Sequence, residues 1–357
     1  MEENKQHKTA LPETEPIPSA QAPEALLDIR GLRVEYHTDE DVVYAVNGLD
    51  LTIGKGESLG LVGETGAGKT TTALSVLRLI ADPPGKIMGG EIWFEGEDML
   101  QAKPARLREI RGSKISVIFQ DPMTSLNPVY SVGDQIAEVI HQHEKCSKEE
   151  GRRKAGDMLE MVGIPRARYD EYPHQFSGGM KQRVVIAMSI ACSPELILAD
   201  EPTTALDVTI QAQVLELMNG LKEKLPTSLL LITPDLGVVA QVCDRVAIMY
   251  AGEIVESGTI AEVFDHPHHP YTIGLFGSIP SLDETAEKLK PIQGQMPDPT
   301  ELPEGCAFAP RCPYATGACR TRKPEMTGVG GTQMVRCLAH QGVFESPELM
   351  EEVRHGR

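Results

Sequence analysis

Along the first 260 residues, short apolar runs alternate with amphipathic stretches. Residues 32–36 and 42–53 alternate between apolar and polar side chains, which predicts a pair of β-strands. Continuous apolar runs predict further strands that are buried on both faces. These runs are residues 58–62, 115–119, 196–199 and 229–232.

Helical spacing appears between these runs. Residues 70–80 place Ala73, Leu77 and Ile80 on one face, and residues 130–172 are mainly helical in pattern. Strands that alternate with helices predict a largely parallel sheet covered by helices. Residues 244–258 indicate a hairpin that turns at Ala251 and Gly252. Regular periodicity ends after this hairpin, so we place a domain boundary near residue 262.

Composition narrows the class of protein. The net charge of −18 argues against nucleic acid as the main partner, because phosphate backbones are bound by excess Lys and Arg. No apolar run approaches the ~18 residues that span a bilayer, and the amino terminus lacks a secretory pattern. We therefore expect the chain to stay in the cytoplasm and to need partner subunits for any membrane role. Residues 1–25 are rich in Pro, Glu and Ala and predict a disordered tail, and residues 344–357 form a second tail.

A glycine-rich loop follows the run at 58–62. Its sequence fits G-x-x-x-x-G-K-[ST], in which backbone amides and the next helix surround a phosphate chain. Lys69 can reach the β- and γ-phosphates, and the Thr70 hydroxyl can bind Mg²⁺. The loop consists of Gly63, Glu64, Thr65, Gly66, Ala67, Gly68, Lys69 and Thr70.

A second motif supports the same chemistry. The apolar run at 196–199 ends in Asp200 and Glu201. Asp200 would hold Mg²⁺ through water, and Glu201 would polarise the attacking water of a phosphoryl transfer. Carboxylates at a strand end are common alone, but beside a phosphate loop they indicate a nucleoside triphosphatase.

Residues 176–183, Phe-Ser-Gly-Gly-Met-Lys-Gln-Arg, lie between these two motifs and resemble the signature sequence of ABC ATPases. Gln120 matches the glutamine loop of that family, and residues 204–207 match its D-loop. The resemblance covers about residues 26–260. It implies an α/β fold with a RecA-like P-loop NTPase core, an antiparallel β subdomain, and a helical subdomain at about 122–175. The domain would span 26–262.

The resemblance also implies a set of site residues. Glu201, Gln120 and Lys69 would be catalytic, and Thr70, Gln120 and Asp200 would hold Mg²⁺. ATP would contact the phosphate loop as far as Thr71. Tyr36 would stack on adenine, although Tyr44 is a rival and either could be a core residue. The signature residues that would contact nucleotide are Ser177, Gly178 and Gly179.

The family implies an assembly as well. Ser177 would cap a helix that opens at Gly178, and the exposed amides would face the γ-phosphate held by a second ATPase subunit. ATP would thus lie between two chains. Closure of the pair on ATP would drive two membrane permease subunits, one of which would insert a coupling helix into the helical subdomain.

Pro234 departs from the family pattern. The family has a histidine that contacts the γ-phosphate where this chain has Pro234, which offers no donor. Loss of one such donor costs about 10²- to 10³-fold in rate. Either this site is weakened and the partner hydrolyses ATP, or Glu201 suffices; His174 is not placed to substitute. The departure favours a partner ATPase that is a different chain.

Residues 263–343 resemble the carboxyl-terminal region of the oligopeptide/dipeptide importers, a subfamily that includes nickel importers. The resemblance rests on residues 265–272 and on four cysteines spaced C-x5-C-x6-C-x17-C. This spacing lacks the tight pairs of structural zinc sites, although zinc and free thiols remain alternatives. The subfamily implies a four-iron four-sulfur cluster. Its ligands would be Cys306, Cys312, Cys319 and Cys337.

Three functions are open at this stage. The first is an ATPase subunit on the cytoplasmic face of the membrane that energises import of peptides, or of nickel or another solute, delivered by an extracytoplasmic binding protein. The second is an ABC ATPase outside transport, against which the single ATPase unit argues. The third is a partly degenerate subunit whose signature completes its partner's site.

Overall fold

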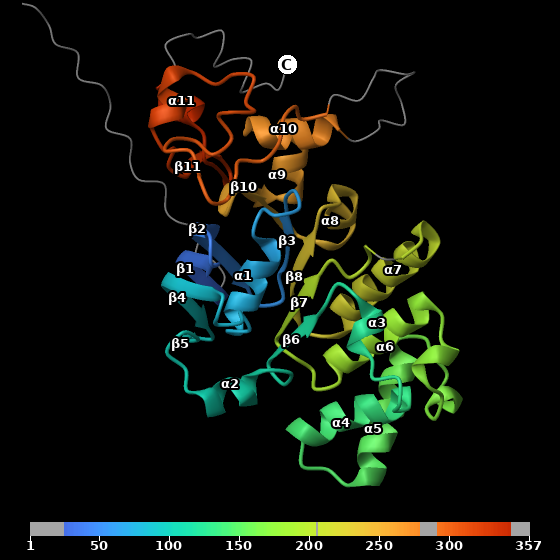
Figure 1. The fold of residues 1–357 in the computed structure, drawn as a ribbon. Coiled ribbons are helices and arrows are strands. Elements are labelled where there is room, and N and C mark those ends of the chain that lie inside the picture. Colours follow the sequence, from blue (N-terminus) through green and yellow to red (C-terminus); the bar gives the residue numbers. More distant parts are fainter. Residues whose placement is uncertain (1–24, 205, 279–290, 344–357) are drawn as a thin grey trace, which may run out of the picture.

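The protein contains two sheets that meet around a central helix (Figure 1). The computed structural model describes residues 25–204, 206–278 and 291–343. The predicted tails lie outside the described residues, apart from Ala25. In Figure 1 the smaller sheet (blue to cyan) and the helices α4 and α5 (green) lie on opposite sides of the strands of the larger sheet.

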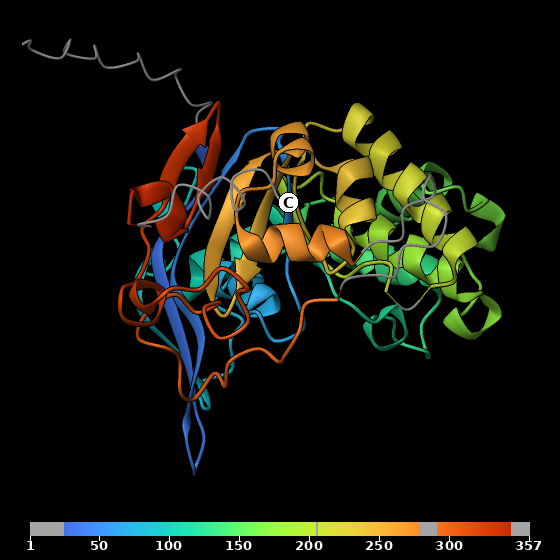
Figure 2. The same cartoon turned by 90° about the horizontal axis from the view of Figure 1, so that it is seen from above.

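The smaller sheet is antiparallel, with strand order β2-β1-β4-β5. The long strands β1 (Ala25–His37) and β2 (Val42–Gly54) confirm the two predicted strands. The strands β4 (Gly85–Phe94) and β5 (Glu97–Asp98) were not predicted from the sequence. Paired β1 and β2 project beyond the body of the molecule as a blue hairpin (Figure 2).

The larger sheet contains the strands predicted to be buried, in the order β11-β12-β10-β9-β3-β8-β7-β6. The strands β3, β6, β7, β8 and β9 run parallel to one another. Their bounds are β3 (Ser58–Val62), β6 (Ile115–Ile118), β7 (Leu196–Asp200), β8 (Ser228–Thr233) and β9 (Arg245–Tyr250). The antiparallel strand β10 (Glu253–Thr259) completes the predicted hairpin.

Both faces of this sheet are buried. Leu230 and Ile232 of β8 pack with the core under the smaller sheet, whereas Leu229 and Leu231 pack with the core under the helices. Alternate residues of a strand point to opposite faces, so a strand between two cores must be apolar throughout. This explains why the parallel strands are continuous apolar runs in the sequence.

Helices cover the sheet and build a separate lobe. The predicted helix after the phosphate loop is α1 (Lys69–Val76), which ends before Ile80 because Arg78 adopts a positive φ of 51°. The helical lobe of residues 130–172 is confirmed in α4 (Val132–His143) and α5 (Lys148–Met161). The remaining helices of the cassette are α2 (Pro104–Ile110), α3 (Pro122–Ser125), α6 (Gly178–Ile190), α7 (Val208–Lys224), α8 (Leu236–Val242) and α9 (Ile260–Asp265), with 3₁₀ turns at Arg166–Arg168 and Pro173–Gln175.

The carboxyl-terminal region is joined to the larger sheet. Its strands β11 (Thr327–Gly330) and β12 (Gln333–Val335) extend the edge at β10, where Glu256 pairs with Val335. The helix α10 (Pro270–Gly277, orange) lies across the view in Figure 2, and α11 (Gly317–Thr321) and a 3₁₀ turn at Leu338–Gln341 complete the region. The boundary predicted near residue 262 falls within α9, and the division into domains stays a prediction.

Candidate functional site

The predicted site residues follow the carboxyl ends of neighbouring parallel strands. Gly63 follows β3, Gln120 lies just beyond β6, Glu201 follows β7, and Pro234 follows β8. These strands are adjacent in the order β3-β8-β7-β6, so their carboxyl ends form one edge. Ligands of open α/β sheets bind at this edge.

The glycines of the phosphate loop are required by close packing. A side chain at Gly63 would collide with the carbonyl oxygen of Met249, and one at Gly68 would collide with that of Ala45. Gly68 also has a φ of 102°, which favours glycine, and it precedes the first residue of α1. The loop is therefore wrapped closely against β2 and β9, with its amides left at the amino end of α1.

Lys69 is held inside the loop. Its Nζ donates to the carbonyl oxygens of Gly63 at 2.7 Å and Glu64 at 3.0 Å. Burial lowers the pKa of Lys69, against the opposing effects of the Glu201 and Asp200 carboxylates. A buried ammonium with acidic neighbours is suited to bind a polyanion, which must replace the two loop carbonyls as its partner.

Asp200 and Thr70 meet beside Lys69. A hydrogen bond joins the two side chains, and burial raises the pKa of Asp200. The Oδ1 atom of Asp200 is buried and has no hydrogen-bond partner among the described residues. Such an oxygen needs a partner that the chain does not supply, and oxygen ligands are what Mg²⁺ prefers. The pair therefore fits the predicted magnesium site.

Glu201 is held by two polar side chains. Its Oε2 accepts from Nε2 of Gln120 at 2.9 Å and from Oγ1 of Thr204 at 3.0 Å. Its φ is 47°, an uncommon conformation for a non-glycine residue, and strained positions cluster at functional sites. The structure thus brings the predicted base and the glutamine loop together.

Tyr36 and Tyr44 contact different parts of the phosphate-loop region. The Tyr36 hydroxyl lies 3.2 Å from Oγ1 of Thr71, at the start of α1. Tyr44 is 38% exposed and lines a cavity with Thr65 and Gly66. Both rings are close to the loop, so the assignment of Tyr36 to adenine stays a prediction.

The signature residues begin α6. Ser177 occupies the N-cap position, but its side chain makes no capping hydrogen bond. A side chain at Gly179 would collide with Ile210 of α7, whereas one at Gly178 would make only an ordinary van der Waals contact with Leu206. Gly179 is therefore required for packing, while the exposed Ser177 and Gly178 leave backbone amides open to a ligand.

Pro234 is exposed and starts the turn into α8. The next residue, Asp235, caps α8 by accepting from the amides of Gly237 at 2.8 Å and Val238 at 3.3 Å. This carboxylate is turned into the helix, so neither residue supplies the donor that histidine provides in the family. His174 lies in a 3₁₀ turn against Tyr172.

The four carboxyl-terminal cysteines line one small cavity, together with His269 and Phe308. Burial raises the pKa of Cys306 to about 11 and the pKa values of Cys312 and Cys337 to about 12. Within the described residues, no three His, Cys, Asp or Glu side chains are arranged to hold a metal ion. The structure thus gathers the thiols but does not confirm a metal site.

Two features escaped the sequence analysis. One is Arg311, which reaches back from the extension to Glu64 of the phosphate loop. The other is a groove between the sheet and the helical lobe, lined by residues that include Leu79, Phe119, Val139 and Met188. Neither has a local sequence motif, because each is created by segments distant in the chain.

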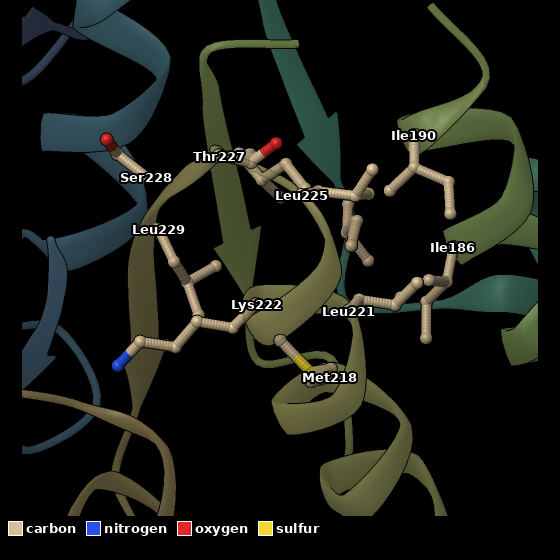
Figure 3. Close-up of a pocket in the computed structure, with 11 residues that line it drawn as sticks. Ile186, Ile190, Met218, Leu221, Lys222, Leu225, Thr227, Ser228 and Leu229 are labelled. Carbon is tan, nitrogen blue, oxygen red and sulfur yellow. The ribbon is translucent and has the colours of Figure 1, made fainter. Parts of the chain in front are cut away.

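Another cavity is apolar and lined by none of the predicted site residues. Figure 3 shows it between α6, α7 and the strands, with Ile186, Ile190, Met218 and Leu221 directed into it. Lys222 lines its rim, and its Nζ binds Asp244 at 2.8 Å. It contains none of the predicted site residues and has no chemistry of its own.

Comparison with known proteins defines the class. The profile of the family described as "ABC transporter" matches residues 46–204. The ATP-binding cassette MJ0796, solved as a dimer in a post-hydrolysis state bound to ADP and Pi, is 27% identical, with a TM-score of 0.59 over 66% of this chain and 98% of that one. The fold is that of an ABC ATPase cassette.

The particular family follows from closer relatives. A profile described as "Oligopeptide/dipeptide transporter, C-terminal region" matches residues 255–319. The oligopeptide transport ATP-binding protein OppD of Bacillus subtilis is 50% identical over 91% of this chain and 93% of its own length. The dipeptide transport ATP-binding protein DppD of the same organism is 48% identical over 88% of this chain and 94% of its own length. The chain belongs to the ATP-binding subunits of the oligopeptide/dipeptide group of ABC transporters. Across the part of the chain that is described, no helix has both the length and the apolar character to cross a bilayer.

Proposed function

We propose that this chain binds and hydrolyses ATP to energise import of peptides through membrane subunits. The observation that carries the proposal is the convergence of Lys69, Gln120, Asp200 and Glu201 at one edge of the parallel sheet. The relatives named for oligopeptide and dipeptide transport support peptide as the solute.

The site residues suggest how this chain would act. Lys69 would exchange its two loop carbonyls for the β- and γ-phosphates, and Asp200 with Thr70 would hold Mg²⁺, which neutralises charge on the phosphates. Glu201 would accept the proton of the attacking water. Gln120 touches Glu201 directly, so a change in the nucleotide would be felt at the end of β6.

The groove beside Gln120 would receive the membrane partner. It is lined by Phe119 and by Thr124 and Ser125 of α3, on either side of the glutamine loop, and Phe119 is 47% exposed. An exposed aromatic ring in a groove is typical of a protein-binding surface. We propose that a cytoplasmic helix of a permease subunit binds here, which would hold the chain at the cytoplasmic face of the membrane. In the full importer, the second permease subunit and an extracytoplasmic solute-binding protein would complete the assembly.

The cysteine cavity is proposed to hold an iron–sulfur cluster. Four thiols from separate segments face one cavity, and their spacing in the sequence lacks the tight pairs that are usual in structural zinc sites. Cys306, Cys312, Cys319 and Cys337 would hold the cluster, whose role would be structural. Iron and sulfide content of protein purified without oxygen, compared between the wild type and Cys312→Ser, tests this. Equal iron content in both would overturn it.

The function is tested with the chain reconstituted with its membrane subunits in proteoliposomes. Glu201→Gln should reduce ATP hydrolysis and peptide uptake together, by about 10²-fold or more if this site is the competent one. Glu216→Gln, a surface change on α7, is the matched control and should leave both unchanged. Uptake that persists without ATP hydrolysis would contradict the proposal.

Pro234 favours a second candidate function for this chain. The absent donor supports a subunit that binds ATP but hydrolyses it slowly, while its signature completes the site of a different ATPase chain. In this case Glu201→Gln in this chain alone should barely lower the rate, whereas Ser177→Arg should abolish it. The two variants together separate the candidates.

A further inference from the structure

The carboxyl-terminal extension makes direct contact with the phosphate loop. The guanidinium of Arg311 donates to both carboxylate oxygens of Glu64, at 3.1 and 2.9 Å. The Arg311 side chain is 6% exposed and that of Glu64 is 30% exposed, so the pair is largely removed from water. Partly buried pairs are screened far less than surface pairs.

A second contact holds the backbone at the same residue. The amide of Glu64 donates to the hydroxyl of Tyr271, on α10, at 3.0 Å. Tyr271 is fully buried, and burial raises its pKa, so the hydroxyl stays protonated. Side chain and backbone of one phosphate-loop residue are thus bound by two segments of the extension.

Aromatic packing keeps these two anchors together. The ring of Phe308 lies 5.2 Å from that of Tyr250 and 5.4 Å from that of Tyr271. The Tyr250 hydroxyl also accepts from Arg311 at 3.4 Å, and Nε of Arg311 donates to the carbonyl oxygen of Gln293 at 3.1 Å. Arg311 is therefore oriented from several sides, as a residue that positions another must be.

The contact between Arg311 and Glu64 is linked to Lys69, the lysine of the proposed ATP site. The carbonyl oxygen of Glu64 accepts from Lys69, so Arg311, Glu64 and Lys69 form a continuous chain of polar contacts. The Glu64 carboxylate would otherwise add negative charge near the phosphates. Arg311 offsets that charge, and Tyr271 fixes the loop backbone from which the lysine must be released.

We propose that Arg311 and Tyr271 are positioning residues of the ATP site, through which the carboxyl-terminal extension sets nucleotide affinity. The inference rests on the ATP site proposed above. The extension then contributes to nucleotide binding, in addition to extending the edge of the larger sheet. Because Phe308 also lines the cysteine cavity, the packing of that cavity and the phosphate loop share one aromatic cluster.

Calorimetric titration of the full chain with MgADP tests the inference. Arg311→Gln should raise the dissociation constant roughly 5- to 20-fold, within the range of coupling between linked sites. In a Glu64→Gln background the pair and the unwanted charge are already absent. Adding Arg311→Gln to that background should therefore raise the dissociation constant far less than Arg311→Gln does in the wild type, since the effect of Arg311 acts through Glu64.

Arg336→Gln is the matched control. Arg336 also anchors the extension, by donating to the carbonyl oxygens of Ile254 and Pro324, but it is not in contact with the phosphate loop. It should lower thermal stability without changing the MgADP dissociation constant. Equal dissociation constants for Arg311→Gln and Arg336→Gln would overturn the inference.

Failure of a variant to fold and failure of the wild type to bind MgADP can be told apart. If Arg311→Gln does not fold, Tyr271→Phe carries the test: it should weaken MgADP binding several-fold, and wild-type affinity in this variant would overturn the inference. If the wild-type chain itself fails to bind MgADP, the proposed ATP site is wrong, and the inference fails with it.

Discussion

The nucleotide site depends on residues whose partners in the structure are incomplete. Within the part of the chain that is described, Lys69 donates only to carbonyl oxygens of its own loop, and one buried oxygen of Asp200 has no hydrogen bond. Both arrangements cost free energy that a phosphate group and a cation would recover. The same residues are therefore poorly satisfied in the structure and suited to bind nucleotide.

Pro234→His tests the most unusual residue of the site. A histidine would restore a donor at the end of β8, so the steady-state ATPase rate of the reconstituted complex should rise, by up to about 10²-fold if this donor limits hydrolysis. The exposed position and the intact Asp235 cap indicate that the fold will accept the change.

Pro234→Ala is the control for removal of the proline ring, and it should leave the rate unchanged. A rate that Pro234→His does not alter would mean that Glu201 suffices and that the weakened-site interpretation is wrong.

Local motifs made most of the site predictable residue by residue. The spacing of Gly63, Gly68 and Lys69, and the carboxylates after β7, each follow from short-range chemistry. Arg311 could not be found in this way, because 247 residues separate it from Glu64. The sequence also did not decide between Tyr36 and Tyr44 as the adenine contact, and both lie near the loop in the structure.

Among the elements, those whose burial alone determines the residue pattern were predictable from the sequence. Strands buried on both faces, such as β8, are apolar throughout and were found. β4 was missed because Gly85, Gly89 and Gly90 interrupt its pattern, and its pairing with β1 overrides their low strand propensity. β11 and β12 were missed because they are short and are stabilised by the edge at β10.

The packing of α6 on α7 predicts different results for two adjacent glycines. Gly179→Val should lower the free energy of unfolding by about 1–3 kcal/mol, because the side chain would overpack against Ile210. A side chain at Gly178 would make only an ordinary contact with Leu206, so Gly178→Val should leave stability nearly unchanged, although it would impair ATP hydrolysis by the assembled complex. Urea unfolding of both variants provides the measurement, and equal losses of stability would contradict the packing argument.

Glu262 links α9 to the extension in a pH-dependent manner. Burial alone would raise its pKa, but hydrogen bonds from Thr332 and Thr259 lower the pKa to about 2. A carboxyl group with a lowered pKa stabilises the fold above its ordinary pKa of 4.5, and this stability is lost as the pH falls towards 2. Glu262→Gln should therefore cost about 1–2 kcal/mol at neutral pH, after allowance for solvent screening.

The same comparison at about pH 3 serves as the internal control. The difference between Glu262→Gln and the wild type in urea unfolding should shrink there, because the wild-type carboxylate is losing its advantage. A difference that is independent of pH would show that Glu262 acts through shape alone.

At the scale of the whole molecule, the extension and the cassette form one structure. β12 continues the larger sheet, Glu256 of β10 accepts from the amides of His268 and His269, and Arg311 binds the phosphate loop. A polar residue as deeply buried as Glu256 is tolerated only with such partners. The loss of regular periodicity after the hairpin predicted a separate extension, because a local pattern does not register pairing between distant strands.

We propose that a second chain supplies half of each ATP site. α1, with the phosphate loop, and α6, with Ser177 at its start, lie on opposite sides of the central strands in Figure 1. Ser177→Arg should therefore leave the MgADP affinity of the isolated chain unchanged, while it greatly lowers ATP hydrolysis by the complex with its partner ATPase and permease subunits. The bulky cation would occupy the place of the partner's γ-phosphate. Calorimetry on the single chain and ATPase assays on the complex give the two readings, and weakened binding in the isolated chain would show that the signature serves its own nucleotide.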